Sequence, residues 1–109
     1  MTPTELNTKV ASALHRNDLT TQITVFIGDA KERLERRFGV VLDTSTDIPP
    51  ATELLFYYAT MQAAYEYLND GDNARYYSDR WELECDRQNV LNPGTVTDNY
   101  AAEPPNMGV

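Results

Sequence analysis

The 109 residues of this chain suit a single domain, and its 17 acidic and 9 basic side chains give a net charge of −8. Such a charge argues against tight binding of a nucleic-acid backbone, and the single cysteine, Cys85, excludes an intramolecular disulfide and favours a reducing compartment. The chain carries neither an apolar run near the ~20 residues of a membrane span nor the features of a signal peptide at its start, so we expect a soluble chain that is not exported.

Residues 4–16 carry the pattern of a first helix, with Thr4 as the predicted N-cap. Their apolar positions repeat at helical spacing and predict one buried side: Leu6, Val10, Ala13 and Leu14. A short corner at Asn17 and Asp18 follows, so we expect the first two helices to be neighbours.

Residues 18–38 have the clearest helical pattern, and we expect this helix to be the centre of the core. Asp18 and the two threonines after Leu19 are candidate N-caps, Gly39 is the predicted C-cap, and Gly28 is the predicted point of close helix packing. Lys31 with Glu35 and Glu32 with Arg36 form opposite-charge pairs at i,i+4. One apolar stripe runs along the helix: Ile23, Phe26, Ile27, Ala30, Leu34 and Phe38.

Residues 40–49 are predicted to form a loop, and Pro49 and Pro50 suit the first turn of a third helix that ends near Leu68. This helix is rich in aromatic residues and should be buried on more than one side. Its main apolar line has heptad spacing: Leu54, Tyr58, Met61, Tyr65 and Leu68.

A polar turn over residues 69–72 leads to a predicted fourth helix, from Asn73 to about residue 91, packed antiparallel on the third. Its expected inner face consists of Ala74, Tyr77, Trp81 and Cys85. A second apolar line on another side is more than a monomeric four-helix unit requires: Tyr76, Leu83 and Val90. The pattern as a whole predicts an all-α fold, a small bundle of about four helices over residues 1–91 that ends in a helical hairpin.

Residues 92–109 contain three prolines and two glycines and have no periodicity, so we expect an extended tail that does not fold on itself. Two interpretations stay open: a disordered terminus, or a strap that docks on another protein or subunit. The strap would hold on through the following residues: Tyr100, Pro104, Pro105, Met107 and Val109.

The sequence offers few groups for catalysis, because His15 and Cys85 are the only residues of their kinds and fall on different predicted helices. Structural roles are expected for both. The spacings of Glu82 with Asp86 and of Glu84 with Gln88 are those of ordinary exposed pairs, and no metal-binding motif is present. We therefore predict no enzyme activity, metal or cofactor.

Charge is distributed unevenly along the chain, and two interpretations of this are open. The charged runs are either solvated helix faces or complementary patches that meet between neighbouring copies. In the second case the subunit contact would join a basic set to an acidic set: Lys31, Arg33, Arg36 and Arg37 against Glu82, Glu84 and Asp86.

The stretch ALHRNDLTTQITVFIGDAKERLERRFGV resembles the opening of the head-to-tail adaptor, or connector, proteins of tailed bacteriophages of the podovirus type. The corner Asp18-Leu19-Thr20 carries this resemblance, and so do six positions of the following helix: Phe26, Ile27, Ala30, Arg33, Leu34 and Arg36. Residues 49–89 look like the family's closing helical hairpin, with Trp81 near the middle of its last helix. The segment 40–49 is shorter than in many relatives, which have a partly β insertion there.

The resemblance implies a structural virion protein at the neck of the particle, assembled in the host cytoplasm as a homo-oligomeric ring that is expected to be dodecameric. Such a ring binds beneath the portal protein, extends the DNA channel and receives a tail or nozzle protein. Genomic DNA would pass without specific binding, with no membrane partner and no turnover. The residues alone leave two alternatives: a small helical protein-binding or regulatory module, and a small hydrolase that uses acidic residues.

Overall fold

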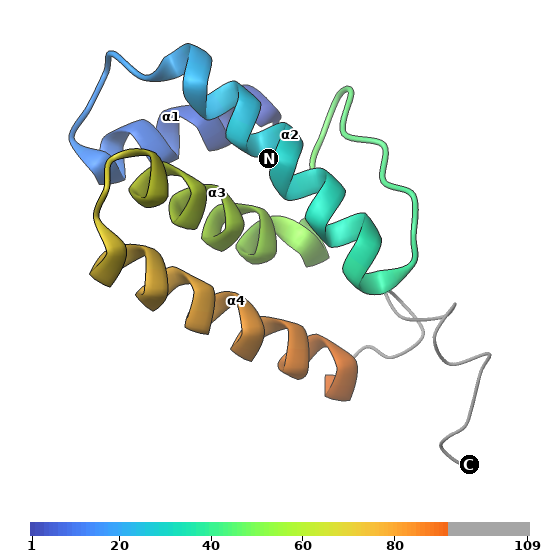
Figure 1. The fold of residues 1–109 in the computed structure, drawn as a ribbon. Coiled ribbons are helices and arrows are strands. Elements are labelled where there is room, and N and C mark those ends of the chain that lie inside the picture. Colours follow the sequence, from blue (N-terminus) through green and yellow to red (C-terminus); the bar gives the residue numbers. More distant parts are fainter. Residues whose placement is uncertain (92–109) are drawn as a thin grey trace.

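The computed structural model describes the backbone of residues 1–91 and the side chains of residues 1–88. This part contains four helices and no strand: α1 (Pro3–Leu14), α2 (Thr20–Phe38), α3 (Glu53–Tyr67) and α4 (Gly71–Leu91), with a short 3-10 turn, η1 (Pro50–Thr52), before α3. The predicted all-α bundle with a closing hairpin is therefore confirmed (Figure 1). The predicted tail, residues 92–109, lies outside the described residues.

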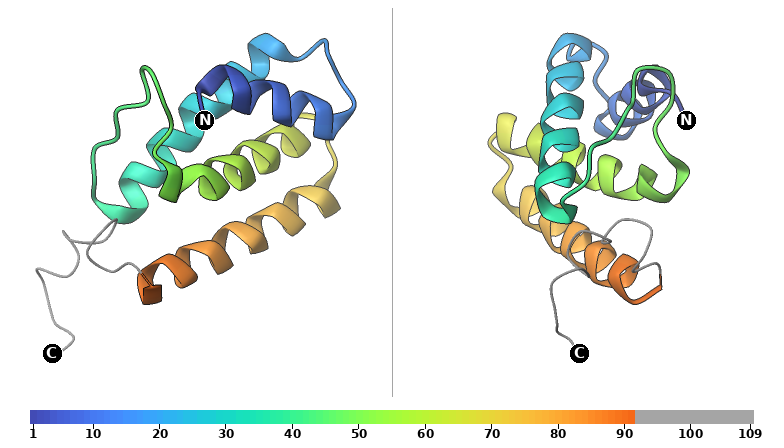
Figure 2. Two further views of the ribbon diagram at one scale, coloured as in Figure 1. Left: turned by 180° about the vertical axis from the view of Figure 1, so that it is seen from behind. Right: turned by 90° about the vertical axis from the view of Figure 1, so that its right-hand side faces the viewer.

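Helix α3 is the centre of the bundle, with α4 along one side and the α1–α2 pair along the other (Figures 1 and 2). Our prediction that α2 would be central is wrong in this respect. The reason is that α3 is apolar around most of its circumference, so it can be covered by several neighbours at once. Its buried residues are Leu55, Phe56, Ala59, Thr60, Met61 and Ala64.

The helix ends differ from the sequence prediction at two caps. Thr2, not Thr4, caps α1, because its hydroxyl accepts the Glu5 N–H at 3.0 Å while the Glu5 carboxylate accepts the Thr2 N–H at 2.7 Å. Asp18 does not cap α2, since its carboxylate pairs with Arg16 at 2.8 Å. Gly39 ends α2 at φ 67°, which confirms the predicted left-handed C-cap.

The apolar stripe of α2 is confirmed at five of its six positions, which are buried: Ile23, Ile27, Ala30, Leu34 and Phe38. Phe26 is only partly buried, with its ring centroid 5.6 Å from that of Tyr67. Gly28 is not a packing point as predicted, because a Cβ at this position would meet nothing within 4 Å. The side of α2 that carries Gly28 is therefore open.

The α3–α4 hairpin confirms the predicted inner face of α4, where Ala74, Trp81 and Cys85 are buried and Tyr77 is partly buried. Helix α4 begins at Gly71, two residues before the predicted start. The predicted heptad line on α3 is wrong at Leu54, which is 42 % exposed. The buried arc of α3 is centred instead near Phe56, because α1 and α2 cover that side of the helix.

Candidate functional site

Two of the basic residues predicted at a subunit contact, Arg33 and Arg37, lie against Trp81 of α4 within one subunit. The Arg33 guanidinium carbon is 3.9 Å and that of Arg37 5.3 Å from the centroid of the Trp81 ring. Arg33 also donates to the Gln62 amide oxygen at 2.7 Å, and Arg37 pairs with Glu82 at 3.0 Å. Burial lowers the pKa of Arg33 from its ordinary value. These contacts join α2, α3 and α4.

The other two basic residues of that set form pairs along α2. Lys31 pairs with Glu35 at 3.0 Å, and Arg36 lies 3.8 Å from Glu32, so both predicted i,i+4 pairs are confirmed. Glu35 also accepts the backbone N–H of Leu42 at 2.8 Å. That hydrogen bond, together with Lys31, lowers the pKa of Glu35. The predicted contact between subunits through this basic set stays a prediction.

Glu84 is buried, with 7 % of its surface exposed, and so is Gln88 at 2 %. The prediction that this pair is exposed is therefore wrong, whereas Glu82 and Asp86 are exposed as expected. The Glu84 carboxylate accepts from Arg87 at 2.9 Å and from Gln88 at 3.0 Å, and these donors, Arg87 first, lower its pKa. Gln88 also donates to the Ala51 carbonyl. Gln88 therefore joins α4 to η1, the turn before α3, and Glu84 holds the Gln88 amide in place.

Exposed apolar side chains and two arginines gather on the outside of the α3–α4 hairpin, which we call the hairpin surface. Its members are Leu54 and the half-buried Tyr58 from α3, and Tyr76, Arg80, Leu83 and Arg87 from α4. Tyr76 is 53 % exposed and Leu83 62 %, one heptad apart. For these two residues the predicted second apolar line of α4 is confirmed, and the side chain of Val90 lies outside the described part. The bundle does not cover this line.

Arg80 is at the centre of the hairpin surface. Its guanidinium carbon lies 5.9 Å from the Tyr58 ring centroid and 5.8 Å from that of Tyr76, so it connects α3 with α4. Within residues 1–88 no carboxylate pairs with Arg80, whereas Arg87 is held by Glu84. The sequence prediction did not single out Arg80, although its position four residues after Tyr76 placed it on the same side of the helix.

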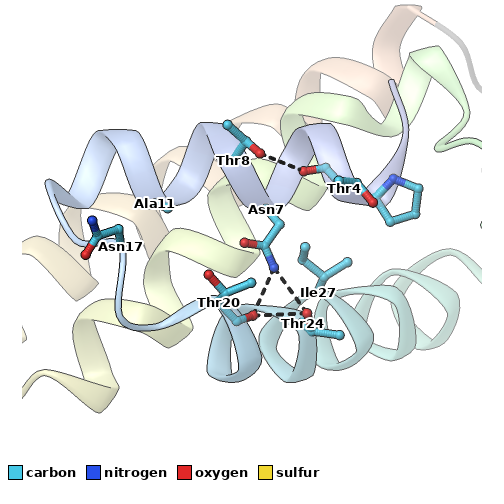
Figure 3. A pocket seen from close by; sticks show the side chains of 9 residues that line it. Thr4, Asn7, Thr8, Ala11, Asn17, Thr20, Thr24 and Ile27 are labelled. Atoms are coloured by element: carbon cyan, nitrogen blue, oxygen red, sulfur yellow. Dashed lines mark hydrogen bonds between the residues drawn. The ribbon is translucent and has the colours of Figure 1, made fainter.

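A groove of about 380 Å³ lies between α1 and α2 (Figure 3). Asn7, only 9 % exposed, crosses it by donating to the Thr20 carbonyl at 3.0 Å and to the Thr24 hydroxyl at 3.1 Å. The other walls are hydroxyl, amide and methyl groups: Pro3, Thr4, Thr8, Ala11, Asn17 and Ile27. Because the lining has no charged side chain, the groove offers little to a charged ligand.

The candidate reactive groups lie apart from these surfaces. Cys85 is fully buried, and burial raises the pKa of its thiol to about 12, so it is an unreactive core residue, as expected. His15 forms the left-handed end of α1 at φ 56°. Residues 1–88 contain no group of three His, Cys, Asp or Glu side chains placed to hold a metal ion. None of the described helices is both long and apolar enough to cross a bilayer.

The predicted anchors for a portal or a neighbouring subunit lie outside the described residues: Tyr100, Pro104, Pro105, Met107 and Val109. No family model, curated protein or solved structure matches the chain. The interpretation of function therefore depends on the surfaces described above and on the order of the sequence motifs.

Proposed function

We propose that this chain is a structural virion protein, a head-to-tail adaptor. Its copies assemble as a ring beneath the portal, which is a direct use of a small helical unit with an uncovered outer face.

 The ring extends the DNA channel, joins the DNA-filled head to a tail or nozzle protein, and is a dodecamer that matches the portal. Its place is the neck of the particle.

The observation that carries this proposal is the hairpin surface. Tyr76 and Leu83 expose apolar side chains that a lone subunit gains nothing by exposing, and they flank Arg80, for which the described residues supply no carboxylate. Copies with a net charge of −8 repel one another, so their contacts need a local positive group beside apolar area. The hairpin surface has both.

Two further features support the adaptor over the alternatives. The order of the corner, the α2 motif and the aromatic hairpin follows that of the adaptor proteins it resembles. An acidic chain also suits a channel through which DNA passes without being held, because like charges repel the phosphate backbone. A hydrolase that uses acidic residues has less support, since Glu84 is buried and held by Arg87 and Gln88.

The hairpin surface also suits a second candidate, a helical protein-binding or regulatory module, because such modules bind partners through exposed apolar and arginine side chains. The two candidates differ in stoichiometry. An adaptor joins portal rings in a fixed number of copies that closes a ring, whereas a regulatory module has no reason to match the symmetry of the portal.

The test is native mass measurement of the purified chain, alone and after mixing with portal rings. The adaptor proposal expects twelve copies per portal ring, and the same number in DNA-filled particles. Binding that is absent, or that saturates at one or two copies per ring, would contradict it.

A further inference from the structure

We propose that the hairpin surface of one subunit binds the C-terminal segment, residues 92–109, of a neighbouring copy. This contact presupposes the proposed ring and identifies the two patches that close it. A closed ring of identical subunits with head-to-tail contacts needs two different, complementary patches on each subunit. Here one patch is the hairpin surface and the other is the segment that follows α4.

The chemistry of the segment complements that surface. It contains Asp98 and Glu103 and no lysine or arginine, so its charge is opposite to that of Arg80. Tyr100, Met107 and Val109 are spaced along it as apolar anchors. Its three prolines oppose a helix and favour an extended chain, which suits a strap lying across two helices.

The hairpin surface supplies the matching groups. Arg80 offers guanidinium donors to a carboxylate, and its aromatic neighbours Tyr58 and Tyr76 hold the guanidinium in position. Tyr76 and Leu83 provide apolar area on either side of it along α4. From Tyr76 to Leu83 the helix rises ~10 Å, a length that about three residues of extended chain cover. Asp98 and Tyr100, two residues apart, therefore fit within this length and can engage Arg80 and an apolar neighbour together.

Chain length allows a neighbouring copy to supply the segment, and ring closure favours that source over the chain's own segment. Eighteen residues reach as far as ~60 Å when extended, about twice the ~32 Å length of a 21-residue helix such as α4. A segment that folded back onto its own hairpin surface would occupy both patches within one subunit and leave neither for ring closure. Binding to the next copy uses each patch once per subunit.

The α1–α2 groove is another place where part of this segment could bind, but its lack of positive charge disfavours an acidic segment. Its lining has hydroxyl, amide and methyl groups and no positive side chain, so Asp98 and Glu103 would lose water without gaining a charged partner (Figure 3). The groove therefore serves as the control surface.

In the test, a fluorescently labelled peptide of residues 92–109 is titrated with the full chain, and its fluorescence anisotropy reports binding. We expect saturable binding that Arg80→Glu weakens at least tenfold and that Leu83→Asp also weakens. Arg75→Glu is the matched control, because it makes the same charge change at an exposed position of α4 away from the line of Tyr76 and Leu83. Neither Arg75→Glu nor Thr8→Glu in the groove should change the affinity.

Absence of saturable binding would overturn the inference, and so would an equal effect of Arg80→Glu and Arg75→Glu. Melting curves of all variants check that the fold is intact, which is expected because the substituted residues are on the surface. Copy number per portal ring separates the two proposals. Rings that form without peptide binding overturn only the hairpin contact, and peptide binding without rings overturns only the adaptor function.

Discussion

Two arginine–aromatic clusters lie on different sides of α4, and they differ in burial and in the polar partners of their arginines. In the inner cluster Arg33 and Arg37 contact Trp81, which is 2 % exposed, and each arginine has a polar partner within the subunit. In the outer cluster Arg80 contacts Tyr58 and Tyr76, and no carboxylate within residues 1–88 pairs with it. The same chemistry therefore stabilises the fold in one place and leaves binding capacity in the other.

What separates the two clusters is coverage by a third helix. Helix α2 closes over Trp81, so burial there contributes to stability and desolvates Arg33. No helix in the described part of the chain closes over Tyr76, so about half of its surface stays in water. The comparison leads to predictions in which substitutions on the inner side change folding and matched substitutions on the outer side do not.

The largest expected effect is that of Trp81→Ala. Truncation of this buried ring removes its packing in the core and the platform under Arg33, so the free energy of unfolding should fall by about 3–5 kcal/mol. Leu83→Ala, two residues further on α4, is the matched control and should change it by no more than about 0.5 kcal/mol. Chemical denaturation measures both, and similar losses for the two variants would contradict the assigned orientation of α4.

A smaller effect is expected for the buried carboxylate at the end of α4. Glu84→Ala removes one of the two acceptors of Gln88, leaving the Ala51 carbonyl, and releases Arg87, and it should cost about 1–3 kcal/mol. Asp86→Ala, at an exposed position two residues away, should leave stability nearly unchanged. Equal denaturation midpoints for the two variants would show that Glu84 does not stabilise this end of the hairpin.

Because the Glu84 carboxylate has a lowered pKa in the folded chain, we expect stability to depend on pH. Arg87 lowers the pKa of Glu84 in the folded chain. Ionised Glu84 therefore contributes fully to stability above the ordinary glutamate pKa of 4.5, and this contribution is lost as pH falls through the lower pKa of the folded chain. Glu84→Gln removes this contribution. The stability of the wild-type chain should therefore fall more steeply than that of the variant below about pH 4.5, as thermal melts across this range would measure. If the stability of the two proteins fell in parallel with pH, Glu84 would not be the group responsible.

The smallest effect, and the only gain, is expected on the open side of α2. Gly28→Ala should raise stability by about 0.5–1 kcal/mol, because alanine favours a helix and its Cβ meets nothing within 4 Å. Gly39→Ala is the control and should lower stability, since φ 67° at the C-cap strains any residue with a Cβ. A loss of stability in Gly28→Ala would mean that this side of α2 is covered.

The helices and the two faces of α4 could be predicted from the sequence because polar residues separate the apolar lines of that helix. On α3 the same reasoning failed, since apolar residues occur on nearly every side and spacing alone cannot distinguish Leu54, which is exposed, from Leu55, which is buried. The burial of Gln88 was also beyond sequence reasoning, because its partner is the Ala51 carbonyl, 37 residues earlier in the chain.

The candidate site was predictable only in part. The second apolar line at Tyr76 and Leu83 was found by periodicity. The distribution of charge along the sequence instead predicted a subunit contact through the basic residues of α2, although one of them, Arg37, pairs with Glu82 inside the subunit. A count of charges carries no information on which pairs fold together, whereas the contact of Arg80 with rings from two helices depends on how α3 and α4 pack.

The most direct test of the account is the copy number of the chain on portal rings for the wild type, Arg80→Glu and Arg75→Glu, measured by native mass on samples with equal melting temperatures. The account predicts a full ring of copies for the wild type and for Arg75→Glu, and strongly reduced occupancy for Arg80→Glu. Full occupancy in all three, or binding of none of them to the portal, would contradict it.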